Sequence, residues 1–389
     1  MVLLLTILMG NVYGFYEGLV EEGEEYYIET AGSTGVPNLN AKAAILYDAT
    51  YDRVLYEKNS REKRANASTT KMITALVAYE NGNLDDVVEV SVKAANTGGS
   101  TINLRKGDKI TLNDLIKGLL VHSGNDAAVA IAEHISGSVE NFAILMNDMA
   151  ETVGAVDTNF VTPHGLDAEN HHSTAYDLMI ISKEILNTPY LANIVAQKTV
   201  EITVNGYTKT LNTTNEMLSF YEGANGIKTG FTGDAGRCLV TSSKRDGRQL
   251  ISVVLGCDTK KNRTTDSVKL LDYGFKSFEL VELSQYVKDN ICIMVEKSQG
   301  GIYSLSKNID LKYPLKAKEK ESLVVKYNIK SGLVAPLPKG EIIAITEIML
   351  NGTTIAKINY SLPENINRKT WKEYFKEIFL GSLEESYIN

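Results

Sequence analysis

The sequence predicts a mixed α/β (α+β) fold. An antiparallel sheet is covered by helices, and a small all-β domain follows it. Strand-like runs occur near the start of the chain and again from residue 199, and the section between them is mainly helical. Strands on both sides of a helical section favour one antiparallel sheet built from the two outer segments. From residue 281 short alternating runs punctuated by prolines indicate the all-β domain.

The first domain is expected over residues 41–278. It begins with strands at 43–47 and 54–57, joined by a turn. Apolar residues at helical spacing predict helices at 68–80, 112–121, 126–135, 139–153 and 174–186, with Thr111 as the N-cap of the second. Strands at 199–204, 227–232, 237–243 and 250–256 follow, and a helix at 263–275 closes the domain.

The second domain is expected over residues 281–362, with strands at 291–295, 302–305, 323–327, 341–350 and 354–360. An amphipathic helix at 366–380 follows it. One face of this helix is apolar and largely aromatic, comprising Trp371, Tyr374, Phe375, Ile378 and Phe379. Such a terminal helix favours peripheral contact with a membrane surface, and docking on the β domain is the alternative.

The amino terminus predicts export. The apolar run Val2–Met9 and the small residues after it indicate a signal peptide over residues 1–14, too short to span a bilayer. No Lys or Arg precedes Lys42, so we expect a truncated signal peptide, and a buried apolar strand is the alternative. The acidic, irregular stretch 15–40 is expected to be a linker.

Composition excludes several classes of protein. With 389 residues the chain is long enough for two domains, and 43% hydrophobic with 23% charged residues is ordinary for a globular protein. A net charge of -8 argues against nucleic-acid binding, which requires a basic surface. The scattered cysteines Cys238, Cys257 and Cys292 predict neither a zinc site nor a disulfide framework and leave the compartment open.

The first chemical motif is Ser68-Thr69-Thr70-Lys71, at the start of an expected helix. Residues three apart share a helix face, so the Ser68 hydroxyl and the Lys71 amine can come within hydrogen-bond reach. Serine becomes a nucleophile when a base takes its proton, and a lysine serves when burial or a second cation lowers its pKa. Free backbone N–H groups at the helix start face a developing oxyanion. Alone, the motif is common by chance, and an exposed N-cap beside a surface lysine is the alternative.

Two further motifs supply cleft groups. Ser123-Gly124-Asn125 falls between two expected helices, where a loop presents a hydroxyl and an amide, although ordinary turn chemistry explains it as well. Lys228-Thr229-Gly230 falls in an expected strand and offers a charge and a hydroxyl to a carboxylate, with Gly230 permitting close approach. An edge strand protected by a lysine is the alternative. Lys228 is also the candidate second cation for Lys71.

Together these motifs resemble the low-molecular-mass penicillin-binding proteins that act as serine D-alanyl-D-alanine carboxypeptidases. The resemblance is carried by residues 67–72, 122–128, 163–167, 226–232 and 235–239, within a span of roughly 41–275. It implies a penicillin-recognising, β-lactamase-like α/β domain followed by a β-rich domain.

The resemblance also implies roles for single residues. Ser68 becomes the acylated nucleophile and Lys71 its general base, while Ser123 and Asn125 form the second cleft motif. The substrate-binding residues are then Lys228, Thr229, Gly230, Phe231, Thr232 and Arg263. Lys228 and Thr229 anchor the terminal carboxylate, with Arg263 near it. Phe231 stands where some relatives carry histidine, and its role is a backbone N–H that completes the oxyanion hole.

The implied activity is removal of the terminal D-alanine from peptidoglycan stem pentapeptides through a serine ester, with no cofactor. β-Lactams are expected as covalent inhibitors, and the protein is expected at the outer face of the cytoplasmic membrane or in the cell wall. A D,D-endopeptidase, a β-lactamase and a catalytically idle cell-wall scaffold remain alternatives. A β-lactamase needs a deacylation base, typically a loop Glu followed four positions later by Asn, and Glu201 with Asn205 has that spacing on an expected strand.

A zinc site is a weaker alternative. His164, His171 and His172 lie close to Asp167 in sequence. Adjacent histidines on a loop make awkward ligands, and the serine chemistry needs no metal, so we expect a structural loop here.

Overall fold

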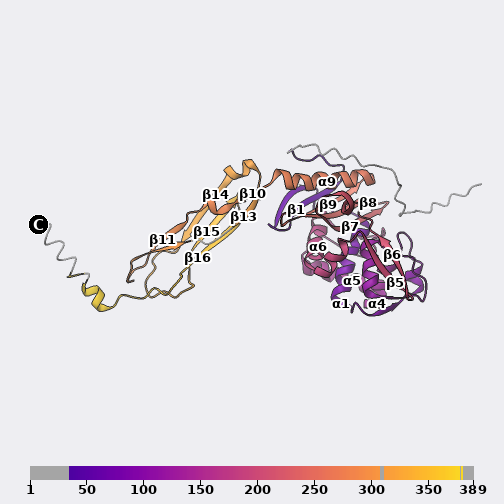
Figure 1. Cartoon of the computed structure of the whole chain (residues 1–389), viewed down its shortest axis with the longest axis horizontal. Coiled ribbons are helices and arrows are strands. Elements are labelled where there is room, and N and C mark those ends of the chain that lie inside the picture. Colours follow the sequence, from indigo (N-terminus) through magenta and orange to yellow (C-terminus); the bar gives the residue numbers. More distant parts are fainter. Residues whose placement is uncertain (1–34, 307–310, 377, 380–389) are drawn as a thin grey trace, which may run out of the picture. The chain divides into compact units, whose positions relative to one another are not determined.

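The computed structural model describes residues 35–306, 311–376 and 378–379 (Figure 1). The chain forms two compact units, residues 1–276 and 277–389, and each is described by itself. The expected signal peptide and most of the expected linker lie outside the described residues. Among the residues described, no helix has the length and apolar character needed to cross a membrane.

The first unit is built on a five-stranded antiparallel sheet in the order β2-β1-β9-β8-β7. Its strands are β1 (Ala43–Asp48), β2 (Arg53–Lys58), β7 (Ala224–Thr232), β8 (Gly236–Arg245) and β9 (Arg248–Cys257). Strand β1 pairs with β9, with Ile45 opposite Val253, so segments about 200 residues apart lie side by side. The predicted fold class and the predicted assembly of the sheet from its outer segments are confirmed.

Helices cover both faces of this sheet, with α9 on one side and α6 with α1, α4 and α5 on the other (Figure 1). The helical segments are η1 (Ala67–Thr70), α1 (Lys71–Asn81), α2 (Val92–Ala95), α3 (Leu112–Val121), α4 (Asn125–Ser136), α5 (Val139–Val153), α6 (Ala175–Asn187), α7 (Pro189–Val195), α8 (Met217–Phe220) and α9 (Lys260–Ser277). Arg248 links the sheet to α9. Its Nε donates to Asp48 Oδ2 of β1 at 2.6 Å in a buried ion pair, and its Nη1 donates to the Gly274 carbonyl of α9 at 3.1 Å.

The expected helices at 112–121 and 139–153 are confirmed, and the Thr111 side chain accepts a hydrogen bond from Asp114 N at 3.1 Å as the predicted N-cap. The expected helix at 68–80 differs at its start. A 3₁₀ turn occupies Ala67–Thr70, and α1 begins only at Lys71. Asn66 Nδ2 donates to the hydroxyls of Thr69 and Thr70, which holds this tighter turn in place.

A second sheet in the first unit was not predicted from the sequence. It has the order β3-β4-β5-β6, with β3 (Val87–Glu89), β4 (Lys109–Thr111), β5 (Thr199–Val204) and β6 (Tyr207–Asn212). The expected strand 199–204 therefore pairs in a hairpin with β6 and does not join the main sheet. Asn205, expected on that strand, lies in the turn with a positive φ of 51°.

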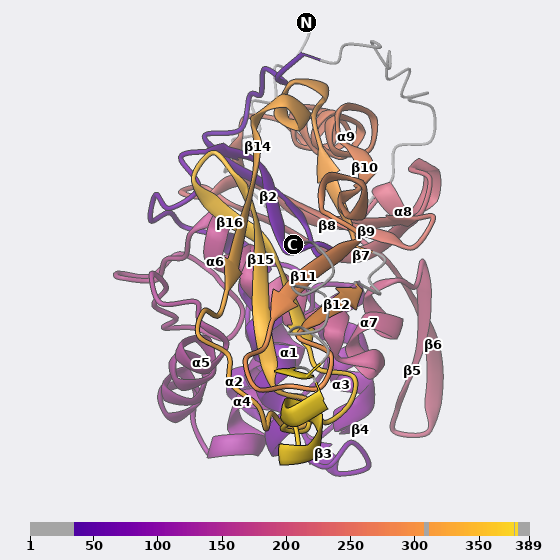
Figure 2. The same cartoon turned by 90° about the vertical axis from the view of Figure 1, so that its left-hand side faces the viewer.

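The second unit consists of small antiparallel sheets around its own apolar core, which confirms its all-β class. Its strands are β10 (Glu279–Glu282), β11 (Asn290–Met294), β12 (Ile302–Ser306), β13 (Lys312–Leu315), β14 (Leu323–Ile329), β15 (Ile342–Leu350) and β16 (Thr353–Ser361), with short 3₁₀ segments η2 (Leu283–Tyr286) and η3 (Ala317–Ser322). Figure 2 shows β14, β15 and β16 side by side.

Part of the expected terminal helix is helical, namely residues 371–376 and 378–379. Its large apolar side chains are exposed, with 72% of Trp371, 65% of Phe375 and 73% of Ile378 accessible to solvent. Phe375 and Phe379 stack on each other. These exposed side chains argue against the alternative in which the apolar face docks on the β domain.

Candidate active site

The structure brings Ser68 and Lys71 together as their spacing predicts. Ser68 lies in the 3₁₀ turn η1, and Lys71 is the first residue of α1. Lys71 Nζ lies 2.7 Å from Ser68 Oγ, and the lysine is fully buried. A buried amine in hydrogen-bond contact with a hydroxyl is suited to receive the proton of that hydroxyl.

Two other groups position the Lys71 amine. Asn125 Oδ1 accepts from Lys71 Nζ at 2.6 Å, and the carbonyl of His164 accepts at 3.0 Å. Both acceptors are uncharged, so they orient the amine without supplying a formal negative charge. The second motif and the 163–167 segment therefore converge on the same nitrogen, although they are far from Lys71 in sequence.

The side chain of Asn125 is itself held by a glycine-containing loop. Its Nδ2 donates to the Gly98 carbonyl at 2.6 Å, and its backbone N donates to the Ser100 carbonyl at 2.7 Å. Gly99 has a φ of +84°, and a Cβ there would lie 2.6 Å from Asn125 Nδ2. Only glycine meets both requirements, so the loop fixes the amide that orients Lys71.

Ser123 and Lys228 form a second contact across the site. Lys228 Nζ donates to Ser123 Oγ at 2.8 Å and to the Thr229 carbonyl at 2.9 Å, and Lys228 is only 1% exposed. Ser123 has a φ of 68°, in the left-handed region that non-glycine residues rarely adopt. Such strain persists where surrounding contacts determine the backbone, and it is frequent at functional sites.

Gly230 lies directly against the 3₁₀ turn η1, which carries Ser68. A Cβ at this position would lie 3.1 Å from Ser68 N, from the Asn66 carbonyl oxygen and from Ala67 Cβ. Strand β7 therefore approaches the Ser68 backbone as closely as a glycine permits. Phe231 follows on the same strand, with Arg237 stacked over its ring at 3.6 Å.

The remaining predicted binding residues have different partners. Thr229 Oγ1 lies 2.6 Å from Thr214 Oγ1. Thr232 Oγ1 instead donates to Asp167 Oδ1 at 2.5 Å, which ties β7 to the 163–167 segment. Arg263 is 4% exposed, and its Nη2 lies 2.8 Å from each carboxylate oxygen of Glu216. Burial opposes ionisation of Glu216, but Arg263 and the Thr264 hydroxyl together keep its pKa below the ordinary value.

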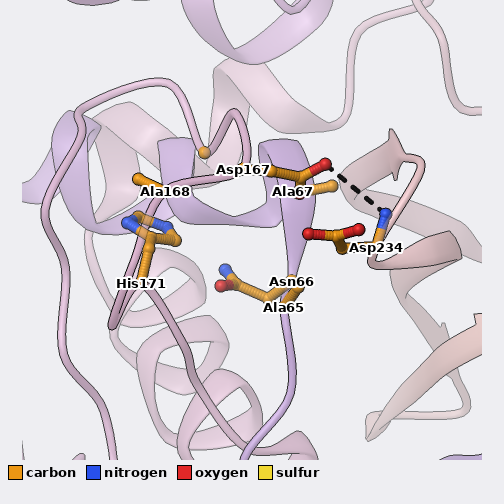
Figure 3. Close-up of a pocket in the computed structure, with 8 residues that line it drawn as sticks. Ala65, Asn66, Ala67, Asp167, Ala168, His171 and Asp234 are labelled. Atoms are coloured by element: carbon orange, nitrogen blue, oxygen red, sulfur yellow. Dashed lines mark hydrogen bonds between the residues drawn. The ribbon is translucent and has the colours of Figure 1, made fainter.

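The 163–171 segment packs against the 3₁₀ turn η1 and the start of α1. Thr74 Oγ1 donates to the Pro163 carbonyl at 2.7 Å. Gly165 has a φ of +81°, and a Cβ there would lie 2.0 Å from the Ala67 carbonyl oxygen. A small cavity of about 30 Å³ remains beside it (Figure 3), and Asp167 faces Asp234, whose backbone N lies 3.4 Å from Asp167 Oδ2.

The histidines of this segment are neutral structural groups. His171 Nδ1 accepts from Val161 N at 3.0 Å, its Nε2 lies 2.9 Å from Thr70 Oγ1, and burial lowers its pKa to about 4. Burial and then the Lys71 charge lower the pKa of His164 to about 3. His164 Nδ1 accepts from Leu166 N at 3.1 Å, so this ring nitrogen is already engaged. Among the described residues, no group of three or more His, Cys, Asp or Glu side chains could hold a metal ion.

Sequence reasoning missed several members of the site: Gly98, Gly99, the His164 carbonyl, Thr214 and Glu216. The 163–167 segment was noticed through family resemblance and as a possible zinc site, and the other positions carry no local pattern in the sequence. Glu201 and Asn205, the pair considered for a β-lactamase, lie in the β5–β6 hairpin, where Asn205 Nδ2 donates to Asp108 Oδ1.

Comparison with known proteins agrees with this geometry. The D-alanyl-D-alanine carboxypeptidase family matches residues 30–259, and the penicillin-binding protein 5 C-terminal domain matches residues 286–368. The chain is 34% identical over 343 residues to the D-alanyl-D-alanine carboxypeptidase DacF of Bacillus subtilis, covering 86% of this chain and 88% of the relative. It is 34% identical over 334 residues to DacA of Escherichia coli K12, covering 82% of each.

Solved structures show the same fold. Penicillin binding protein 5 from Haemophilus influenzae superposes with a TM-score of 0.69 at 31% identity, covering 86% of this chain and 98% of that one. The Streptomyces K15 DD-transpeptidase superposes with a TM-score of 0.59 at 30% identity, covering 61% of this chain and 98% of that one. The chain described here belongs to the D-alanyl-D-alanine carboxypeptidase family of serine peptidases.

Proposed function

We propose that this protein removes the terminal D-alanine from peptidoglycan stem pentapeptides through an ester on Ser68. The observation that carries the proposal is the pair of contacts Ser68–Lys71–Asn125 and Ser123–Lys228, in which each of two buried lysines contacts a serine hydroxyl. Family membership supports the reaction class, and the contacts support the assignment of roles.

The first step is attack of Ser68 on the carbonyl carbon of the penultimate D-alanine residue. Lys71 in its neutral form takes the Ser68 proton while Ser68 Oγ bonds to the carbonyl carbon. The carbonyl oxygen becomes an oxyanion, which the backbone N–H groups of Ser68 and Phe231 stabilise. Gly230 of β7 packs against Ser68 N, and Phe231 is the next residue of that strand.

The second half of the reaction releases D-alanine and then the shortened peptide. Collapse of the tetrahedral intermediate breaks the C–N bond, and the leaving amine takes a proton that Lys71 delivers through the Ser123 hydroxyl. Water then attacks the ester carbonyl, Lys71 takes one water proton, and Ser68 regains its hydroxyl hydrogen. The acid product is the tetrapeptide.

Specificity for a chain end follows from charge. Lys228 and Thr229 supply an ammonium and a hydroxyl for the terminal carboxylate. A substrate without that carboxylate cannot form this charge-assisted contact and loses the binding energy it supplies. β-Lactams carry a carboxylate in a comparable place and acylate the same serine, which makes them covalent inhibitors.

Covalent labelling tests the proposal. A fluorescent penicillin is expected to label the wild type and the control Ser304→Ala, an exposed serine of β12 in the second unit, but not Ser68→Ala. Release of D-alanine from diacyl-Lys-D-Ala-D-Ala is expected to follow the same pattern. Labelling of Ser68→Ala, or absence of D-alanine release by the wild type, contradicts the assignment. A long-lived acyl-enzyme distinguishes it from a β-lactamase.

We further propose peripheral attachment outside the cytoplasmic membrane through Trp371, Tyr374, Phe375, Ile378 and Phe379. The exposed Trp371 beside Lys372, and the half-buried Tyr374 beside Lys369, suit the interface of an anionic membrane. Flotation with vesicles containing phosphatidylglycerol is expected for the wild type and to be lost in a Trp371→Ser, Phe375→Ser double variant. Equal flotation of both proteins contradicts the contact.

A further inference from the structure

Thr214 makes a side-chain contact with a residue of the proposed carboxylate anchor, although it belongs to none of the three motifs. Its Oγ1 lies 2.6 Å from Thr229 Oγ1. Thr229 is 6% exposed, whereas Thr214 is half-buried, so the hydroxyl pair lies at the boundary between the buried strand and solvent. Either oxygen can be the donor in this contact.

The backbone around Thr214 is held from two sides. Thr214 N donates to the carbonyl of Val121, the last residue of α3, at 3.1 Å. Thr213 N donates to the Lys198 carbonyl at 2.8 Å. These two contacts fix the position of the Thr214 main chain beside Thr229.

A second contact nearby also joins the end of α3 to strand β7. Two residues after Val121, Ser123 Oγ accepts from Lys228 Nζ at 2.8 Å. The end of α3 and strand β7 are therefore linked by Lys228 on one side and, through Thr214, by Thr229. Both anchoring residues of β7 are thus oriented by contacts to this one corner.

Glu216, two residues after Thr214, determines the charge of this segment. Glu216 neutralises Arg263 through two contacts of 2.8 Å, so its carboxylate is directed at the arginine. An uncompensated carboxylate near the anchor would repel an anionic substrate. The pairing with Arg263 allows a short segment, Thr213–Glu216, to approach an anion site without opposing it.

We propose that Thr214 is a positioning residue for the substrate's terminal carboxylate and acts through Thr229. A hydroxyl has one proton, so in a pair of hydroxyls one oxygen donates and the other accepts. When Thr214 donates, Thr229 keeps its own proton for the carboxylate, and a charge-assisted hydrogen bond favours that arrangement. When Thr229 donates to Thr214, the anchor loses its hydroxyl donor. This inference rests on the anchoring role proposed for Lys228 and Thr229.

The test compares Thr214→Val, Thr214→Ser and Thr214→Ala. For diacyl-Lys-D-Ala-D-Ala we expect Thr214→Val and Thr214→Ala to raise KM roughly tenfold, the effect of one hydrogen bond to a charged group, with kcat changed by less than about twofold. Thr214→Ser keeps the hydroxyl and is expected to retain the wild-type KM. Thr214→Ala repeats the test if valine prevents folding.

A second measurement separates positioning from simple stability. Acylation by penicillin is expected to slow roughly tenfold in Thr214→Val, whereas acylation by penicillin methyl ester, which lacks the anionic carboxylate, is expected to stay at the wild-type rate. Thr203→Val is the matched control, because Thr203 Oγ1 also contacts a second threonine hydroxyl, that of Thr208 at 3.0 Å, in the exposed β5–β6 hairpin. That variant is expected to behave as wild type.

Two results overturn the inference. One is an equal loss of acylation rate with the acid and the ester, which indicates a structural role for Thr214. The other is an unchanged KM for the peptide in both Thr214→Val and Thr214→Ala. The proposed function fails separately, through absence of D-alanine release or of Ser68 labelling in the wild-type protein.

Discussion

The Gly230→Ala substitution is a direct test of how closely strand β7 must approach the nucleophile. The added Cβ would lie 3.1 Å from each of three atoms: Ser68 N, the Asn66 carbonyl oxygen and Ala67 Cβ. Contacts of this length are tighter than nine in ten real Cβ contacts, so strand and turn must separate by a few tenths of an ångström. Gly230 does not have a positive φ, so the substitution adds bulk without backbone strain.

The expected cost follows from the oxyanion geometry. Loss of one oxyanion donor typically costs about 100- to 1000-fold in kcat, and a displacement of a few tenths of an ångström weakens a donor without removing it. We therefore expect kcat for D-alanine release to fall roughly 10- to 100-fold, with a smaller change in KM. Overpacking is expected to cost about 1–3 kcal/mol in the free energy of unfolding.

The matched control is Gly233→Ala, one residue after the end of β7. A Cβ at Gly233 meets nothing within 4 Å, so wild-type kcat and stability are expected. Rates of D-alanine release and of penicillin acylation would be measured alongside urea unfolding. Wild-type kcat in a folded Gly230→Ala protein, or an equal loss of kcat in Gly233→Ala, would refute the close approach as the basis of the effect.

Three further substitutions probe the groups around the site. Asn125→Ala removes the amide oxygen that lies 2.6 Å from Lys71 Nζ. We expect kcat for D-alanine release to fall at least 100-fold. Near-wild-type kcat would show that Ser68 Oγ and the His164 carbonyl are enough to position the amine. Glu216→Gln leaves the buried Arg263 charge without its carboxylate. We expect the free energy of unfolding, measured with urea, to fall by about 3 kcal/mol. Unchanged stability would contradict a structural role for this ion pair. His171 has a folded pKa of about 4, below its usual value, so the unfolded chain binds more protons between about pH 6.5 and 4 and stability falls as pH drops through that range. His171→Asn should reduce the difference in unfolding free energy between pH 7.5 and 4.5 by roughly 2–3 kcal/mol, and an undiminished difference would assign the acid sensitivity to other groups.

Local chemistry explains why many elements were predictable. The helices at 112–121 and 139–153 carry their own N-caps and an apolar stripe, so their bounds follow from nearby residues. The contact between Ser68 and Lys71 was predictable for the same reason, because one turn of helical backbone separates the two side chains. The start of α1 was not predictable, since the 3₁₀ turn depends on the Asn66 side chain and on the segments packed against it.

Contacts between distant segments explain what the sequence did not predict. Strand 199–204 has the expected bounds, but its partner is β6 and not the main sheet, because the Asn205–Gly206 turn folds it into a local hairpin. Thr232 and Arg263, which are expected to bind the substrate, contact the carboxylates of Asp167 and Glu216 in this structure, and the sequence did not predict these contacts. Neither carboxylate is near its partner in sequence, so no periodicity could have indicated these contacts.

For this protein, the sequence alone determined the fold class, the family resemblance and the contact between Ser68 and Lys71, since each depends on residue types at short spacings. Tertiary structure alone decided which atoms surround that pair. The His164 carbonyl, the Gly98 carbonyl and the Thr214 hydroxyl reach the site from separate loops. Backbone carbonyls are present at every residue, and only folding selects the few that a buried amine or amide needs as partners.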